Sequence, residues 1–135
     1  MAMQLRIVCP ETSAYEGEAA FVALPSTDGE LGVAARHASE ICTLGSGYIR
    51  VSDTAMGTID HRFAVSGGYA QIADDEVIVL AERAADVDAV DVARVQAKLQ
   101  GFEDQLSVLS ENDARRAYLY NEIAWCRLLL DAQTS

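Results

Sequence analysis

Basic residues, prolines and long apolar runs are all scarce in this chain of 135 residues. Only 10 Lys and Arg residues stand against 21 Asp and Glu residues, which gives a formal net charge of −11 at pH 7. A nucleic-acid-binding surface needs basic side chains to displace counterions from phosphates, and anionic lipid likewise attracts polybasic segments. The charge balance therefore excludes a nucleic-acid partner and an electrostatic attachment to lipid.

The three cysteines, Cys9, Cys42 and Cys126, are widely spaced and form no C-x-x-C motif. An odd number of isolated cysteines excludes a closed disulfide framework, and the two histidines, His37 and His61, are too few to complete a structural zinc site. No window approaches the roughly 18 consecutive apolar residues of a membrane span, and no signal peptide is visible. We therefore expect no metal and no direct membrane insertion.

Motifs of an enzyme active site are also missing. Asp60 and His61 are adjacent in sequence, but neighbouring strand residues point to opposite faces and would not form an oriented base. The glycine-containing segments 29–32 and 66–68 lie in no strand–loop–helix unit, so they match neither a phosphate-binding loop nor a dinucleotide fingerprint. The sequence thus predicts a non-catalytic protein with a binding, structural or regulatory role.

What the chain does contain is an uneven distribution of turn-forming residues. Both prolines and eight of the nine glycines precede residue 70. Between them lie short segments rich in β-branched and aromatic residues, as expected of strands. These segments are residues 4–8, 21–24, 41–44, 48–52, 58–65, 69–73 and 76–81. With Ser46-Gly47, Ser66-Gly67-Gly68 and Asp74-Asp75 as turns, they predict an antiparallel β-sandwich, or flattened barrel, over residues 1–85.

After Ala85 the apolar spacing changes to alternating steps of three and four residues, which predicts a helix. The stripe consists of Val92, Val95, Leu99, Phe102, Leu106 and Leu109. Residues 110–113 form a capping-box pattern in which Ser110 begins a second helix. Its stripe consists of Leu119, Ile123, Cys126 and Leu130. Two helices of about twenty residues joined by a short turn predict an antiparallel two-helix hairpin over residues 86–135.

Several segments resemble the epsilon subunit of F-type ATP synthases of the bacterial and plastid type. They are residues 5–11, 15–18, 24–33, 37–38, 63–69 and 77–84, and they follow one another in the family's order. The resemblance implies a rotating central-stalk subunit whose sandwich contacts the gamma subunit and the membrane c-ring. It also implies that the helices either fold onto the sandwich or extend towards the catalytic alpha and beta subunits, where they restrain ATP hydrolysis.

On this reading the chain is a non-catalytic subunit that couples proton flow to ATP synthesis. It would lie peripherally on the cytoplasmic face of the bacterial plasma membrane or on the stromal face of the thylakoid. The alternative, from a different functional class, is a free-standing ligand-binding or scaffold module with a similar fold.

The resemblance also implies contact roles for individual residues. Glu30 and His37 match the segment that faces the c-ring, although an ordinary turn carboxylate is the alternative for Glu30. The chain departs from the family at Ala34-Ala35-Arg36 and at Ser39, where the family has a Leu-Pro-Gly-type stretch and a second proline. Because proline fixes φ, a loop without these prolines is less pre-set.

Basic residues of the helices are implied to meet an acidic segment of the beta subunit. Arg115, Arg116 and Arg127 are the residues available, with a solvated surface as the alternative. Some members of the family also bind regulatory ATP through an (Ile/Leu)-Asp-x-x-Arg-Ala motif. Asp91 and Arg94 are the corresponding candidates in residues 90–95, but the final Ala is missing, and in the ungapped alignment Asp91 replaces the arginine and would repel a triphosphate. No other cofactor is expected.

Overall fold

The computed structural model describes residues 2–10, 12–54 and 57–134. Contacts divide the chain into two compact units, Met1–Asp88 and Ala89–Ser135. The sequence places this boundary between residues 85 and 86. The last strand of the first unit continues to Asp86, and a single 3-10 turn, Val87–Ala89, follows it.

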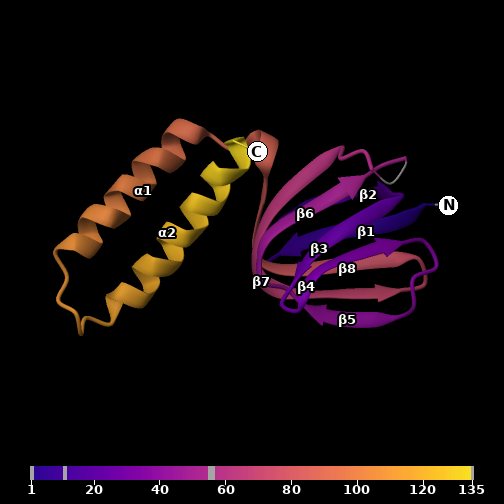
Figure 1. Cartoon of the computed structure of the whole chain (residues 1–135), viewed down its shortest axis with the longest axis horizontal. Coiled ribbons are helices and arrows are strands. Elements are labelled where there is room, and N and C mark those ends of the chain that lie inside the picture. Colours follow the sequence, from indigo (N-terminus) through magenta and orange to yellow (C-terminus); the bar gives the residue numbers. More distant parts are fainter. Residues whose placement is uncertain (1, 11, 55–56, 135) are drawn as a thin grey trace. The chain divides into compact units, whose positions relative to one another are not determined.

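Eight strands form the first unit within the described residues. They are β1 (Met3–Cys9), β2 (Thr12–Ala19), β3 (Phe21–Ser26), β4 (Gly29–Ala34), β5 (Glu40–Thr43), β6 (Ser46–Ser52), β7 (His61–Ala73) and β8 (Glu76–Asp86). Their hydrogen-bonded order is β2-β1-β8-β7-β6-β3-β4, with β5 paired to β7 (Figure 1). The pairs are antiparallel except for β1 with β8, which is parallel. The predicted β-sandwich is confirmed, and this one parallel pair is the exception to its antiparallel pairing.

The core lies between the inward faces of these strands. Alternation along β1 buries Met3, Leu5 and Ile7 and exposes Gln4 and Arg6 between them. The other large side chains that are fully buried come from five further strands: Val22, Leu24, Val33, Ile49, Val51, Phe63, Val65, Val77 and Val79. Burial of each such side chain contributes about 1.5–3 kcal/mol, so this core carries most of the favourable free energy of folding of the first unit.

Two strands were not predicted, and each lacks the usual strand signal. β2 lies at one end of the sheet order, and it carries Glu16, Gly17 and Glu18 in place of a β-branched run. β4 lies at the other end and contains Gly29 and Gly32. Strands at a sheet edge have one neighbour and a solvated side, so they can form with few apolar residues.

Two predicted turns are wrong. Ser46-Gly47 forms the beginning of β6, and β7 continues through Ser66-Gly67-Gly68 from His61 to Ala73. Gly67 and Gly68 have φ values of 70° and 106°, which rotate the strand without ending it. Before them Phe63 and Val65 are buried, and after them Ala70 and Ile72 are buried. The inward positions therefore change from odd to even residue numbers. This rotation allows the first half of β7 to pair with β6 and the second half to pair with β5.

The second unit contains α1 (Val92–Ser107) and α2 (Arg115–Asp131), which pair as a hairpin (Figure 1). The two-helix hairpin is confirmed, with helices of 16 and 17 residues. In α2 the buried residues are Leu119, Ile123, Cys126 and Leu129. Leu129 takes the place predicted for Leu130, which is half-buried. No helix in the described part of the chain is long and apolar enough to cross a membrane.

The predicted capping box at Ser110 is also wrong. The residue before α2 is Ala114, and Ser110 contributes only its backbone carbonyl, which accepts from the Asp113 N–H at 3.1 Å. The carboxylate of Asp113 instead accepts from the Arg115 N–H at 2.9 Å. Asp113 satisfies a free N–H of the first turn of α2, as a capping side chain does. The helix begins at Arg115, four residues later than a cap at Ser110 would place it.

Candidate functional site

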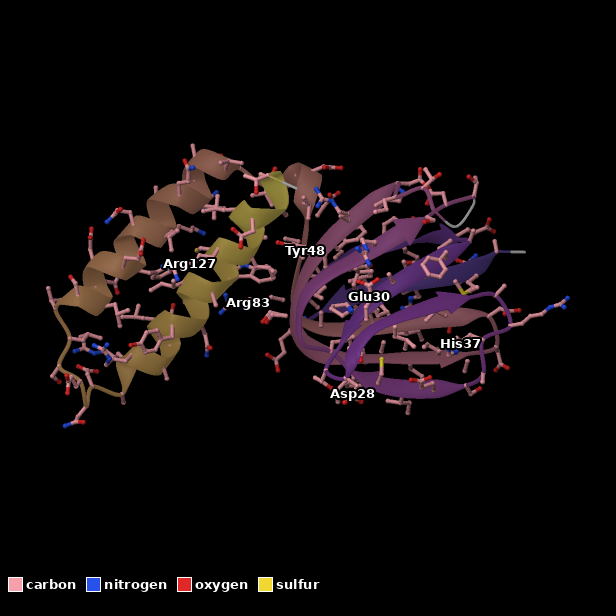
Figure 2. All side chains as sticks on the ribbon, viewed as in Figure 1. Asp28, Glu30, His37, Tyr48, Arg83 and Arg127 are labelled. Atoms are coloured by element: carbon pink, nitrogen blue, oxygen red, sulfur yellow. The ribbon has the colours of Figure 1, made fainter. Side chains whose placement is uncertain are left out.

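Glu30 lies on β4, one residue after the tight turn that joins it to β3 (Figure 2), and its side chain is 58% exposed. It accepts a hydrogen bond from the guanidinium of Arg50 on β6. Both side chains are exposed, and exposed ion pairs contribute about 1 kcal/mol or less. The pair orients the Glu30 carboxylate at little cost, so a partner can displace Arg50.

A hollow of about 390 Å³ opens beside Glu30 between the β3–β4 turn and β5. Two contacts join its walls: the hydroxyls of Thr27 and Thr43 are 2.7 Å apart, and the Thr27 N–H donates to the Thr43 carbonyl at 3.0 Å. Ile41, on the same short strand, is 70% exposed. The structure thus brings Glu30 close to β5, a proximity that the sequence alone does not predict.

His37 follows β4 in the connection to β5 (Figure 2). Its backbone N–H donates to the Ala34 carbonyl at 3.2 Å, which closes a turn. The ring Nδ1 lies 2.7 Å from the Ala38 carbonyl oxygen. A carbonyl only accepts, so Nδ1 donates in this contact, and Nε2 is the ring nitrogen that this contact does not use. His37 does not line the hollow beside Glu30.

An apolar row on the outer face of the sandwich was not predicted from the sequence. Val8 pairs with Leu80 across β1 and β8, and Leu80 pairs with Tyr69 across β8 and β7. Tyr69 is 45% exposed and Leu80 is 38% exposed, and the exposed Ile41 lies on the adjoining strand β5. Contiguous exposed apolar residues of this kind mark interaction surfaces. This row cannot be predicted from the sequence, because the rotation of β7 at Gly67 and Gly68 decides which of its residues point outward.

His61 has a carboxylate partner, but it is not its sequence neighbour. Its Nε2 lies 3.0 Å from the Asp53 carboxylate, while Asp60 accepts from the Asp53 backbone N–H at 2.7 Å. The ring of Tyr15 packs against His61 in a tilted arrangement, with 5.3 Å between the ring centroids. Burial raises the pKa of Tyr15, and Asp53 and Asp60 add to the rise. These contacts join Asp53, just after β6, to the residues at the beginning of β7. No group of three His, Cys, Asp or Glu side chains suited to a metal occurs among the described residues.

The three arginines proposed to meet an acidic partner all have partners within the hairpin. Arg115 binds the Asp113 carboxylate through Nε at 3.0 Å and Nη2 at 2.7 Å. Arg116 donates to the Leu109 carbonyl at 3.3 Å and to the Tyr120 hydroxyl at 2.8 Å. Arg127, on α2, donates to Glu103 of α1 at 3.2 Å (Figure 2).

These contacts show what the arginines do in the closed hairpin. Arg116 donates to the carbonyl of Leu109, which lies in the connection just after α1, and so ties this connection to the first turn of α2. Arg127 joins the two helices, and Arg115 neutralises the carboxylate at the start of α2. An acidic partner would therefore have to compete with each of these contacts.

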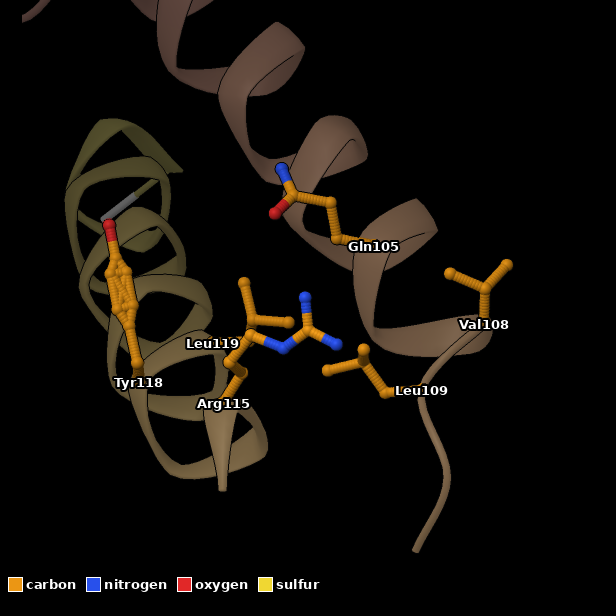
Figure 3. A pocket seen from close by; sticks show the side chains of 6 residues that line it. All are labelled: Gln105, Val108, Leu109, Arg115, Tyr118 and Leu119. Atoms are coloured by element: carbon orange, nitrogen blue, oxygen red, sulfur yellow. The ribbon is translucent and has the colours of Figure 1, made fainter. Parts of the chain in front are cut away.

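The tip of the hairpin is hollowed between the end of α1 and the start of α2 (Figure 3). The hollow measures about 400 Å³ and is lined by Gln105, Val108, Leu109, Arg115, Tyr118 and Leu119. Val108 beside it is 81% exposed. The guanidinium of Arg115 is already paired with Asp113, so the surface that this hollow offers is mainly apolar.

The Asp113–Arg115 pair gives the hairpin a defined acid sensitivity. Side-chain and backbone hydrogen bonds from Arg115 hold the pKa of Asp113 at about 2, below its ordinary value of 3.8. A depressed carboxylate pKa stabilises the folded state above pH 3.8, and that contribution is lost as the pH falls through about 2. We expect the Arg115 amide resonance to titrate with a midpoint near 2 in NMR spectra, and this step to disappear in Asp113→Asn. A midpoint near 4 would show that the pair does not form.

Asp91 and Arg94 meet at the beginning of α1, but through the backbone of Arg94. The Asp91 carboxylate accepts from the Arg94 N–H at 3.1 Å and so caps the helix. N-cap carboxylates of this kind stabilise helices by about 1 kcal/mol, which explains an aspartate here without any ligand. Regulatory ATP binding at these two residues stays a prediction.

The arrangement defines a class of protein: a β-sandwich with an appended helical hairpin, whose candidate residues are exposed or half-buried. Residues 2–87 match the model of the ATP synthase Delta/Epsilon chain beta-sandwich domain. The ATP synthase epsilon chain of Desulfitobacterium hafniense strain DCB-2 is 36% identical over 115 residues, 85% of each chain. That of Bacillus pumilus is 32% identical over 126 residues, covering 93% of this chain and 94% of the relative. This chain therefore belongs to the ATP synthase epsilon chain family and is a subunit of that complex.

Solved structures show the same fold. A chain of the Euglena gracilis mitochondrial ATP synthase (OSCP/F1/c-ring) has a TM-score of 0.75 at 19% identity, covering 98% of this chain and 81% of its own length. A chain of the Tetrahymena thermophila mitochondrial ATP synthase central stalk and c-ring has a TM-score of 0.60 at 15% identity, covering 96% and 95%. The similarity extends over both units.

Proposed function

We propose that this chain is the non-catalytic epsilon subunit of the central stalk of an F-type ATP synthase, where it links the gamma subunit to the c-ring and couples proton flow to ATP synthesis. The observation that carries the proposal is the match to epsilon chains across 85% of both chains, spanning sandwich and hairpin. The two structural neighbours come from rotor-containing assemblies, which supports the same partners. The subunit would lie on the cytoplasmic face of the plasma membrane, or on the stromal face of the thylakoid.

Two surfaces of the sandwich are suited to this role. The segment with Glu30 and His37 offers an exposed carboxylate and an imidazole Nε2, which we assign to the c-ring loops. The apolar row of Val8, Leu80 and Tyr69 offers the kind of area that a stable protein partner covers, and we assign it to the gamma subunit. Neither assignment requires chemistry at a buried active site.

Co-purification separates this function from a free-standing scaffold or ligand-binding module. A tagged full-length chain expressed in its own host should retain a gamma subunit and a c-ring through size-exclusion chromatography. Replacing both Leu80 and Tyr69 by Ser should reduce the recovered gamma subunit by at least tenfold. Ser removes the apolar surface but should leave the fold intact, because both side chains already face solvent. A monomer with neither partner would contradict the stalk assignment.

The hairpin is proposed to restrain ATP hydrolysis, and only weakly. Arg115, Arg116 and Arg127 must leave their present partners before they can bind an acidic segment. A new exposed ion pair with that segment contributes about 1 kcal/mol or less, so little free energy is gained. Deleting residues 89–135 in the assembled enzyme should therefore raise ATP hydrolysis by about two- to fivefold, with ATP synthesis and gamma co-purification retained. Unchanged hydrolysis would remove the inhibitory role and leave the stalk role intact.

A further inference from the structure

The turn that carries His37 contains an arginine in a left-handed conformation. The His37 N–H bonds to the Ala34 carbonyl and closes a four-residue turn, in which Arg36 is the third residue with φ of 68°. Ala35, the second residue, does not have a positive φ. This is the pattern of a type II turn, which favours proline in the second position and glycine in the third. The chain has alanine and arginine there, so the turn adopts this shape against the preference of its own residues.

A carboxylate from a distant turn holds Arg36 in place. The Arg36 backbone N–H donates to Oδ1 of Asp75 at 2.5 Å. Asp75 lies in the two-residue turn between β7 and β8, where Asp74 and Asp75 have φ values of 53° and 59°. Its own carbonyl accepts from the Gln4 N–H of β1 at 3.0 Å. Asp75 is therefore fixed to the sandwich by its main chain, while its side chain reaches the other turn.

We infer that Asp75 is a positioning residue, whose carboxylate keeps the turn of residues 34–37 in its type II form and thereby orients His37 towards the partner. A hydrogen bond to an ionised acceptor is stronger than one between neutral groups, so it can offset the cost of a left-handed arginine. Without it the Arg36 N–H, which belongs to the central peptide of the turn, loses the acceptor that fixes its direction, and the next residue along the chain is His37. The inference rests on the proposed function, because it takes the His37 segment to be a contact surface.

A double-mutant cycle in the full-length chain tests this role. The readout is the Kd for a gamma–c-ring subcomplex that lacks its own epsilon subunit. Asp75→Ala should weaken binding about tenfold. Asp75→Asn should stay within about twofold of wild type, since the amide oxygen can accept the same hydrogen bond. Arg36→Gly combined with Asp75→Ala should recover most of the loss, because glycine adopts the left-handed conformation without support.

Asp74→Ala is the matched control. It removes one charge and places alanine at a positive φ in the same turn, but it leaves the Asp75 carboxylate in place. Equal losses in Asp74→Ala and Asp75→Ala, or no rescue by Arg36→Gly, would overturn the inference and leave Asp75 with an ordinary role in the stability of the turn.

Amide hydrogen exchange provides a readout that needs no partner. Protection of the Arg36 and His37 amides should fall in Asp75→Ala and be retained in Asp75→Asn and in Asp74→Ala. Unchanged protection in Asp75→Ala would overturn the positioning role by itself. If protection changes as expected but the wild-type chain binds no subcomplex, the proposed function fails while the hold of Asp75 on the turn stands.

Discussion

Gly68→Ala is expected to lower the free energy of unfolding of the sandwich by about 3–5 kcal/mol, which is enough to unfold much of the population at 37 °C. Gly68 has φ of 106°, and an added Cβ would lie 2.0 Å from the Leu80 carbonyl oxygen and 2.8 Å from Cα of Ala81. Both are backbone atoms of β8, so no side-chain rotation relieves the overlap. Urea denaturation followed by circular dichroism measures the change, with a constant m value showing that the unfolding stays two-state.

Two glycine controls separate the causes. Gly29 has φ of 122°, but a Cβ added there would meet no atom within 4 Å, so Gly29→Ala tests conformational strain alone and should cost about 1–2 kcal/mol. Gly101 lies inside α1 with the same open space and no positive φ, so Gly101→Ala should stabilise the hairpin by about 1 kcal/mol. A loss at Gly68 no larger than that at Gly29 would contradict the steric argument.

Phe63→Ala is expected to cost about 3–5 kcal/mol, the usual range for truncating a buried aromatic residue. Phe63 is 2% exposed and is the largest fully buried side chain of the first unit. The ring of Tyr15 packs on it at 5.2 Å and also contacts His61, so the cavity would loosen the β2 edge as well as the core. Denaturant unfolding monitored by NMR, with resonances from both units, gives the free energy and shows which unit unfolds.

Phe102→Ala is the control for this substitution. Phe102 is half-buried in α1 and meets Tyr118 of α2 edge-on at 6.5 Å. Its truncation should cost about 1–2 kcal/mol, because less apolar surface returns to water, and the loss should fall on the hairpin resonances. Equal losses for the two phenylalanines would show that the sandwich core is not the main source of stability.

The fold could be predicted where spacing along the chain is itself the signal. The alternation in β1 and the three-and-four spacing of Leu99, Phe102 and Leu106 identify a strand and a helix without knowledge of anything else. β2 escapes prediction because an edge strand needs few apolar residues. The sequence predicts two strands in place of β7 because Gly67 and Gly68 are typical turn residues. In the structure β7 stays continuous, because it pairs with β8 along one side and with β6 and then β5 along the other.

The candidate site could be predicted only in part. Glu30 and His37 were found through resemblance to a family, because their loop has a recognisable order of residues. Asp75 carried no such signal: it lies 39 residues from Arg36, and an acidic pair in a hairpin turn is common. The roles of Arg116 and Arg127 inside the hairpin were likewise invisible, since their partners Leu109 and Glu103 are set by the way the two helices meet.

The sequence by itself determined the two-part architecture, the acidic character and the family of this protein, because composition, periodicity and the order of motifs are properties of the chain alone. Only the tertiary structure decided which side chains face outward on β7 and β8, which carboxylate holds the His37 turn, and which contacts occupy the hairpin arginines. The physical reason is that these features depend on register and on strand rotation, which bring together residues that are far apart in the chain. The scarcity of prolines acquires a structural consequence here, since a hydrogen bond from the Arg36 N–H to the Asp75 carboxylate holds a turn that a proline would otherwise have fixed.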